Sequence, residues 1–276
     1  MTPRGVTNRG TAGRGMDYLE VQGLTVDFDG FKAIDGVDLT LIEGELHFLI
    51  GPNGAGKTTL VDALTGLVRG TGLARYDGHD LLALKSHQIV RAGVGRTFQT
   101  ATVFDQLSVL QNLDIADGLH RSAWRLGLPR RRVSDRVEQA LDTIGLDALR
   151  DRPAGVLAHG QKQWLEIGML LVQEAKVMLL DEPVAGMSAE ERDETGLLLK
   201  RVGAERTIVV IEHDMEFVRQ FADKVTVMHA GKVLTAGTVG EIQSDARVQE
   251  VYLGRTADAV NVDPSAVAAE ASGEDA

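Results

Sequence analysis

The stretch that most constrains the fold is 46–59, which reads LHFLIGPNGAGKTT. It opens with a short apolar run, 46–50, which is typical of a strand buried on both faces. A loop with three glycines follows, and Lys57 then starts a segment of helical character that we expect to reach Val68. The spacing Gly51-x4-Gly56-Lys57-Thr58 is the phosphate-binding loop pattern. The sequence therefore predicts a strand, loop and helix that bind a nucleoside triphosphate.

The residues of this loop have defined chemical tasks. Glycines let the backbone wrap closely around phosphate, so that its N–H groups and the helix N-terminus point at the anion. We expect Lys57 to reach the β- and γ-phosphates and the Thr58 hydroxyl to ligate Mg²⁺. The predicted phosphate-binding residues are Gly51, Pro52, Asn53, Gly54, Ala55, Gly56, Lys57, Thr58 and Thr59.

The rest of the pattern indicates an α/β fold. Two antiparallel strands joined through Asp29-Gly30 are expected before the loop, and buried strands are expected at 177–180 and 207–211. The pattern is mostly helical from about 86 to 173, and a hairpin through His229-Ala230-Gly231-Lys232 closes the domain. We expect a P-loop nucleotide-binding domain over 16–255, with an antiparallel β subdomain and a helical insertion. Residues 1–15 are predicted to be a flexible tail, and 256–276 an acidic, disordered one.

Composition narrows the classes of function. The chain has no cysteine, which excludes disulfides and thiolate metal sites. No apolar run approaches the roughly 18 residues that would span a bilayer. A net charge of −11 argues against nucleic acid as a partner.

A second motif ends the strand at 177–180. Two carboxylates, Asp181 and Glu182, follow directly. A buried strand would deliver Asp181 beside the phosphate loop, where it can orient Mg²⁺ through a water. Glu182 points differently and is a candidate general base for the attacking water.

Three further segments complete a recognisable set: Gly95-Arg96-Thr97-Phe98-Gln99, Leu157-Ala158-His159-Gly160-Gln161 and His213. With the two motifs above, they resemble in order and spacing the ATP-binding subunits of ABC transporters, over about 240 residues. The resemblance implies ATP and Mg²⁺ as cofactors. It implies that Gln99 contacts Mg²⁺ or its water, that His213 donates to the γ-phosphate, and that Phe28 stacks on adenine. Phe31 is the rival for the last role.

In this family two cassettes face each other head to tail, and the signature loop of each completes the ATP site of the other. Here that loop would be Ala158, His159, Gly160 and Gln161. The resemblance also implies two transmembrane permease subunits and a second ATPase subunit, with a hetero-partner favoured over a homodimer. A periplasmic or extracellular solute-binding protein would act indirectly. The chain would sit peripherally on the cytoplasmic face of the membrane.

Within the family the chain is most similar to urea-importer ATP-binding subunits of the UrtD type, which are relatives of the branched-chain amino-acid importers. The segments that carry this likeness are 98–104, 159–166, 182–187 and 250–255. Urea import is thus expected, with branched-chain amino-acid import as the alternative. A soluble cassette is a weaker alternative, because such proteins typically carry zinc cysteines, coiled-coil arms or two cassettes per chain. The third alternative is a cassette that binds ATP without hydrolysing it.

One position departs from the family pattern. The signature usually has serine where this chain has Ala158. A serine hydroxyl would donate to the partner's γ-phosphate, and alanine cannot. Losing a hydrogen bond to a charged group costs about 1.5–3 kcal/mol. We therefore hypothesise that the two ATP sites of the assembled dimer are unequal.

Overall fold

The computed structural model describes residues 18–97, 102–120 and 133–252. The two predicted tails lie outside the described residues, and so does Gln99.

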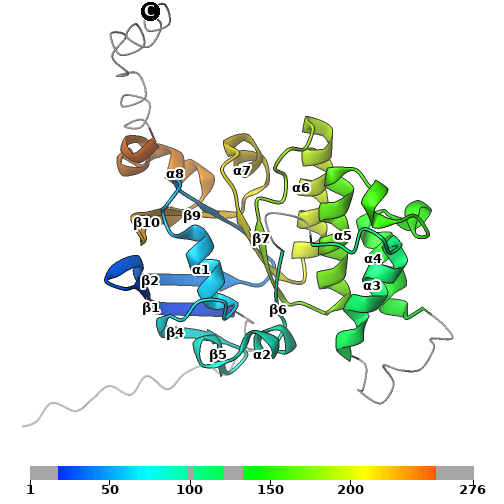
Figure 1. The fold of residues 1–276 in the computed structure, drawn as a ribbon. Helices are drawn as coiled ribbons and strands as arrows, with labels where there is room; N and C mark the ends of the chain where they lie inside the picture. The colour runs from blue at the N-terminus through cyan, green and yellow to red at the C-terminus, as the bar shows by residue number, and fades with distance from the viewer. Residues whose placement is uncertain (1–17, 98–101, 121–132, 253–276) are drawn as a thin grey trace, which may run out of the picture.

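A mostly parallel sheet of the order β10-β9-β3-β8-β7-β6 forms the centre of the molecule (Figure 1). Its strands β3, β8, β7 and β6 run parallel, β9 is parallel to β3, and β10 pairs antiparallel with β9 as the predicted hairpin. The bounds are β3 Leu46–Ile50, β6 Val94–Arg96, β7 Val177–Asp181, β8 Thr207–Ile211, β9 Lys224–His229 and β10 Lys232–Gly237.

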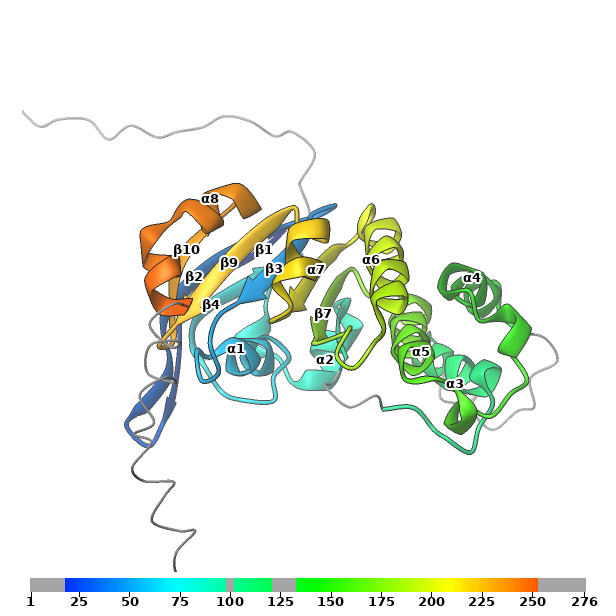
Figure 2. The same cartoon turned by 90° about the horizontal axis from the view of Figure 1, so that it is seen from above.

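The three inner strands β3, β7 and β8 are buried on both faces, as their continuous apolar runs predict. Successive side chains point to opposite faces of a strand. Leu49, Leu179 and Val209 accordingly contribute to one core, together with the helix α1. Phe48, Leu180 and Val210 belong to the other core, which α6 and α7 cover (Figure 2).

The second sheet is antiparallel and confirms the predicted β subdomain. Its order is β2-β1-β4-β5, and β1 and β2 are joined through the turn at Asp29 and Gly30. Its apolar side chains, such as Leu24 and Ile34, join the core on the α1 face. The bounds are β1 Tyr18–Phe28, β2 Phe31–Ile42, β4 Thr71–Tyr76 and β5 His79–Asp80.

The structure differs from the prediction in two of the helical regions. The helix after the phosphate loop ends at Leu64 and not at Val68, because Gly66 has φ +71°, a left-handed conformation that a right-handed α-helix cannot contain. The range 86–173 holds a strand, β6, in addition to its helices. The bounds are α1 Lys57–Leu64, α2 Ser86–Arg91, α3 Val109–Ala116, α4 Asp135–Ile144, α5 His159–Val172, α6 Ala189–Gly203, α7 Met215–Phe221 and α8 Val239–Ser244.

Helices α3, α4 and α5 pack together at the far end from the antiparallel sheet (Figures 1 and 2). Their shared core contains Leu113, Leu141, Ile144 and Leu165. Gly168 on α5 permits this contact, because a Cβ there would lie 2.6 Å from Cδ1 of Ile144. Among the described helices, none is long and apolar enough to cross a membrane.

Candidate functional site

The phosphate loop, 51–56, joins β3 to α1, and its backbone geometry requires glycine at two points. Gly51 has φ +148°, and a Cβ there would lie 2.2 Å from the carbonyl oxygen of Met228. Gly56 has φ +99°, and its Cβ would lie 2.6 Å from the carbonyl oxygen of Ala33. A side chain at either position would have to displace backbone. The loop is therefore packed between two neighbouring segments and held in one shape.

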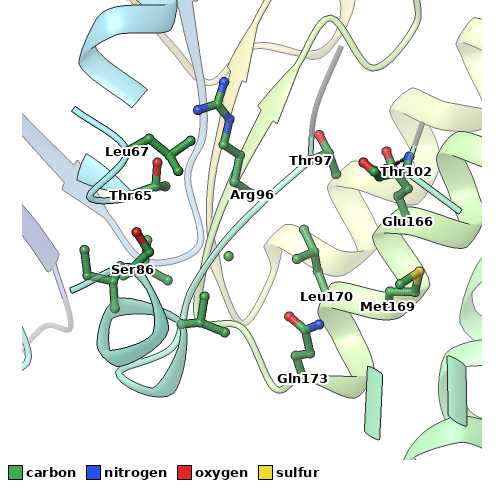
Figure 3. Close-up of a pocket in the computed structure, with 14 residues that line it drawn as sticks. Thr65, Leu67, Ser86, Arg96, Thr97, Thr102, Glu166, Met169, Leu170 and Gln173 are labelled. Carbon is green, nitrogen blue, oxygen red and sulfur yellow. Dashed lines mark hydrogen bonds between the residues drawn. The ribbon is translucent and has the colours of Figure 1, made fainter. Parts of the chain in front are cut away.

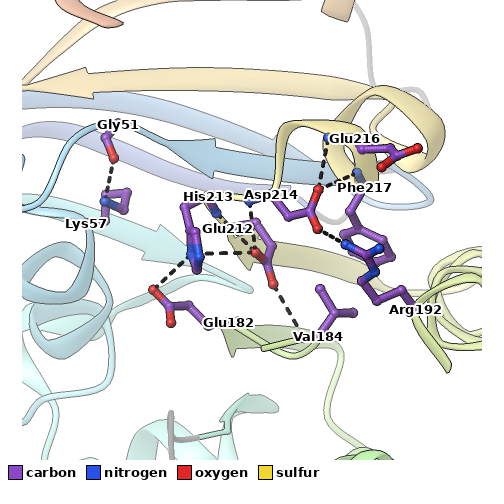
Figure 4. Close-up of polar contacts among 10 residues, drawn as sticks. All are labelled: Gly51, Lys57, Glu182, Val184, Arg192, Glu212, His213, Asp214, Glu216 and Phe217. Atoms are coloured by element: carbon purple, nitrogen blue, oxygen red, sulfur yellow. Dashed lines mark hydrogen bonds and ion pairs between the residues drawn. The ribbon is translucent and has the colours of Figure 1, made fainter. Parts of the chain in front are cut away.

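Lys57 begins α1 and reaches back over this loop. Its Nζ donates to the carbonyl oxygens of Gly51 at 2.8 Å and of Pro52 at 3.1 Å (Figure 4). Thr58 and Thr59 follow in the first turn of the helix. The N-terminal turn of a helix presents free N–H groups to an anion, and this arrangement suits the phosphates of a nucleotide.

The order of the sheet brings the other motifs to the same edge. Strand β8 lies between β3, which leads into the phosphate loop, and β7, which ends at Asp181. Asp181 pairs in register with Ile211 at the end of β8. Since the carboxyl ends of parallel strands meet at one edge, Glu182 and His213 follow on adjacent strands beside the phosphate loop.

Glu182 and His213 are brought into contact. Nδ1 of His213 lies 3.4 Å from Oε1 of Glu182 (Figure 4). Glu182 has φ +49°, an unusual value for a residue with a side chain, and its N–H donates to the carbonyl oxygen of Ile211 at 3.0 Å. The His213 side chain is 67% exposed, so it is open to a ligand. A carboxylate and an imidazole in this relation can hold a water and a phosphate oxygen between them.

Asp181 is buried and faces Arg96 on β6. Nη2 of Arg96 lies 3.5 Å from Oδ2 of Asp181, and its Nη1 pairs with Asp62 on α1. Burial raises the pKa of the Asp181 carboxyl, and the charge of Arg96 acts in the opposite direction. Sequence reasoning missed the roles of Arg96 and Asp62, since a pair 34 residues apart leaves no pattern.

The residues present fit ATP with Mg²⁺. Mg²⁺ takes oxygen ligands and is usually held by one or two protein groups together with phosphates and waters. The Thr58 hydroxyl and the Asp181 carboxylate are such ligands. Within the ranges that the structure describes, no three His, Cys, Asp or Glu side chains gather into a metal site of their own. Gln99, the third predicted ligand, lies outside these ranges.

The two candidate adenine-stacking residues face each other across a turn. Phe28 ends β1, Phe31 starts β2, and the two pair in the strand register. Phe28 is 48% exposed and Phe31 is 69% exposed. Neither is a core residue, so both rings are open to a ligand.

The predicted signature residues lie at the start of α5. Ala158 is the N-cap, and its N–H donates to Oε1 of Gln161 at 3.1 Å. At α3 and α6 this interaction is reciprocal, because Ser108 and Ser188 also accept an N–H from the third helical residue. Alanine has no oxygen to accept one, so the first turn of α5 keeps an additional free donor.

Contacts of the signature residues run to the segment that follows Glu182. A Cβ on Gly160 would lie 3.2 Å from Oε1 of Glu191 and 3.5 Å from Cε of Met187. A Cβ on Gly186 would lie 3.9 Å from Cδ2 of His159. The segment 186–191 therefore packs directly against the signature loop.

A cavity of about 260 Å³ lies between α2 and α5 (Figure 3). Its walls include Leu67, Ile89 and Leu170, and on α5 the buried Glu166 accepts the N–H of Thr102. Burial raises the pKa of the Glu166 carboxyl. No residue of the phosphate loop lines this cavity. We assign it no part in nucleotide binding.

Sequence reasoning also missed Glu212, which directly precedes His213. Its side chain is 1% exposed. It accepts backbone N–H groups from both loops that carry Glu182 and His213. A single acidic residue at a strand end gives no signal that it turns inward.

Comparison with known proteins agrees with this geometry. The family model described as "ABC transporter" matches residues 34–185. BraF of Pseudomonas aeruginosa, a high-affinity branched-chain amino acid transport ATP-binding protein, is 38% identical over 248 residues, which cover 86% of this chain and 97% of BraF. LivG of Salmonella typhimurium, described in the same words, is 37% identical over 249 residues, 86% of this chain and 97% of LivG.

A solved structure is similar over nearly its whole length. It is the ADP conformation of an ATP-binding cassette of an ABC transporter, and it superposes with a TM-score of 0.76 at 28% identity. The alignment covers 87% of this chain and 100% of that cassette.

Proposed function

Because the chain belongs to the ATP-binding proteins of ABC transporters, we propose that it powers an importer whose solute is a branched-chain amino acid. The observation that supports this solute is the identity of 37–38% to two branched-chain amino acid transport subunits over almost their full lengths. These relatives favour branched-chain amino-acid import, the alternative in the sequence analysis, over urea import.

Urea stays as the second candidate. It is supported by the segments 98–104, 159–166, 182–187 and 250–255, which resemble urea-importer subunits more specifically than the general motifs do. Solute choice in such systems lies with permeases and binding proteins, so neither candidate is read from this chain's own chemistry.

The proposed reaction is hydrolysis of ATP between two cassettes. Lys57 and the N–H groups of the phosphate loop bind the β- and γ-phosphates. Thr58 and Asp181 would hold Mg²⁺, and a bound Mg²⁺ would neutralise phosphate charge. Glu182 takes a proton from the water whose oxygen attacks the γ-phosphorus. The bond from that phosphorus to the β,γ-bridging oxygen breaks and ADP leaves, while His213 donates to the γ-phosphate. Gln99 would contact the metal or its water and link the nucleotide to the permease.

The proposed assembly contains two permease subunits and a second cassette. The signature loop, Ala158 to Gln161, completes the ATP site of that second cassette, and a hetero-partner is favoured over a copy of this chain. A solute-binding protein delivers the solute on the other side of the membrane. This chain then acts at the cytoplasmic face, bound to its permeases.

Uptake measurements test the proposal. Labelled leucine and labelled urea are followed in the native cell with wild-type chain and with Lys57→Ala, at equal protein levels. The substitution removes the cation that faces the phosphates while leaving the helix intact. Lys200→Ala, on the surface of α6, is the matched control, because its ion pair with Asp223 is exposed and contributes little.

Loss of leucine uptake with normal urea uptake supports the proposal. Loss of urea uptake alone would move urea to first place. If both solutes enter normally, and no second system carries them, neither solute is correct.

A further inference from the structure

Glu212 is a buried carboxylate placed between the two loops that carry the proposed catalytic pair. Its Oε2 accepts the N–H of His213 at 3.0 Å and the N–H of Asp214 at 3.4 Å. Its Oε1 accepts the N–H of Val184 at 3.4 Å (Figure 4). One side chain thus binds the loop after β8 to the loop after β7.

Burying the Glu212 carboxylate costs free energy, which the hydrogen bonds to it must offset. A carboxylate removed from water is unfavourable unless hydrogen bonds replace its hydration. Burial raises the pKa of Glu212, and the three N–H donors and the neighbouring His213 act against that rise. Hydrogen bonds from N–H groups to a carboxylate are stronger than those to a neutral acceptor. The two loops are therefore fixed to each other at this point.

A second contact runs parallel to the first. Arg192 on α6 pairs with Asp214, whose other oxygen accepts the N–H groups of Glu216 at 3.0 Å and Phe217 at 3.1 Å at the start of α7. The residue after His213 is thus held by α6 and α7 together. The ring of His213 lies near two carboxylates, with Nδ1 at 3.4 Å from Glu182 and 3.9 Å from Glu212.

We propose that Glu212 is a positioning residue for ATP hydrolysis, which holds the backbone of His213 in register with the segment after Glu182. The inference rests on the proposed function, since it assigns Glu212 to the same reaction. The segment concerned, 183–187, continues to Gly186 and Met187, which lie against His159 and Gly160. A shift of Val184 would therefore reach the signature loop as well.

Two substitutions separate this role from a local one. Glu212→Gln keeps the length of the side chain but replaces an acceptor oxygen by an amide donor, which opposes one of the N–H groups. Glu212→Asp keeps the charge and can still accept from its own loop, but it is one methylene shorter and withdraws from Val184. Glu216→Gln is the matched control, because Glu216 is exposed and only its backbone N–H takes part.

The transporter complex is purified through a tag on this chain, and steady-state ATP hydrolysis is measured against ATP concentration. We expect both Glu212 variants to lower kcat by about tenfold, because small misplacements of reacting groups are costly. The KM for ATP and the binding of a fluorescent ATP analogue to the isolated chain should change by less than about twofold, since Glu212 contacts no phosphate-loop residue. Glu216→Gln should match the wild type.

The inference is overturned if Glu212→Asp keeps the wild-type kcat, because Glu212 would then only cap its own loop. It is also overturned if both variants lose ATP affinity and melting temperature along with kcat, which would mean general damage. If the wild-type complex hydrolyses ATP and both Glu212 variants keep its kcat, the inference is rejected and the proposed function is not. A wild-type complex that hydrolyses no ATP rejects the proposed function together with it.

Discussion

Nδ1 of His213 lies 3.4 Å from Oε1 of Glu182, although the two residues are 31 positions apart and follow different strands. The contact exists because β7 and β8 are adjacent and parallel and end at the same level. It places a carboxylate and an imidazole at the edge of the sheet where β3 leads into the phosphate loop.

Replacing Glu182 by Gln should stop hydrolysis and preserve ATP binding. The amide keeps the shape of the side chain but cannot take a proton, and general-base catalysis contributes roughly 10²–10⁴-fold to a rate. We expect kcat of the assembled complex to fall within that range while the ATP dissociation constant stays near the wild-type value. Phosphate release and binding of labelled ATP measure the two quantities. Hydrolysis at the wild-type rate would remove Glu182 from the reaction.

Phe28→Ala and Phe31→Ala form a matched pair at one turn. If Phe28 stacks on adenine, its truncation should weaken ATP binding by about 1–3 kcal/mol, the range found for aromatic stacking on bases. Phe31→Ala should leave the affinity unchanged. Titration of the isolated chain with ATP distinguishes the two, and the reverse result would transfer the stacking role to Phe31.

Ala158→Ser should complete the capping interaction at α5. The hydroxyl can accept the N–H of Gln161, as Ser188 accepts that of Glu191, and an N-cap of this kind contributes about 1 kcal/mol to stability. Urea denaturation measures this gain. The hydroxyl also supplies the donor that the partner's γ-phosphate lacks, so turnover of the assembled complex should rise. An unchanged or lower turnover counts against unequal ATP sites.

The buried His47 should make the folded state sensitive to acid. Burial lowers its pKa to about 3, while its ordinary value is 6.5, and its Nε2 lies 2.8 Å from Oγ1 of Thr226. Between pH 6.5 and about 3 the unfolded chain binds a proton at His47 that the folded chain does not. Stability therefore falls as the pH decreases through this window, by about 1.4 kcal/mol per pH unit from this group.

His47→Gln should remove that contribution, so that the variant gains on the wild type as the pH is lowered. The measurement is the free energy of unfolding of both proteins at several pH values. His87→Gln, at an exposed position on α2, is the control. Parallel pH curves for wild type and His47→Gln would contradict the prediction.

Much of the fold follows from short patterns. The apolar runs at 46–50, 177–180 and 207–211 are buried strands, and Ser188 with Glu191 marks the start of α6. The strand β6 was missed, because three residues with a central glycine carry no alternation and are held by pairing with β7. The end of α1 was missed because apolar residues continue past Gly66.

The site divides in the same way. Lys57, Asp181, Glu182 and His213 stand at positions that a motif can specify. No motif specifies Glu212, because its role depends on a contact with the backbone N–H of Val184, which belongs to another loop. Local sequence carries no record of such a contact.

Arg96 joins three segments that each carry a motif, since its guanidinium meets Asp62 on the phosphate-loop helix and Asp181 at the end of β7. Removing one member of a buried ion pair typically costs about 3–5 kcal/mol, because the charge that remains is uncompensated. A mutation of Arg96 alone would leave two carboxylates facing each other. We expect these three positions to be inherited as a unit. A lineage that changes one of them must either pass through a less stable protein or change the other two as well.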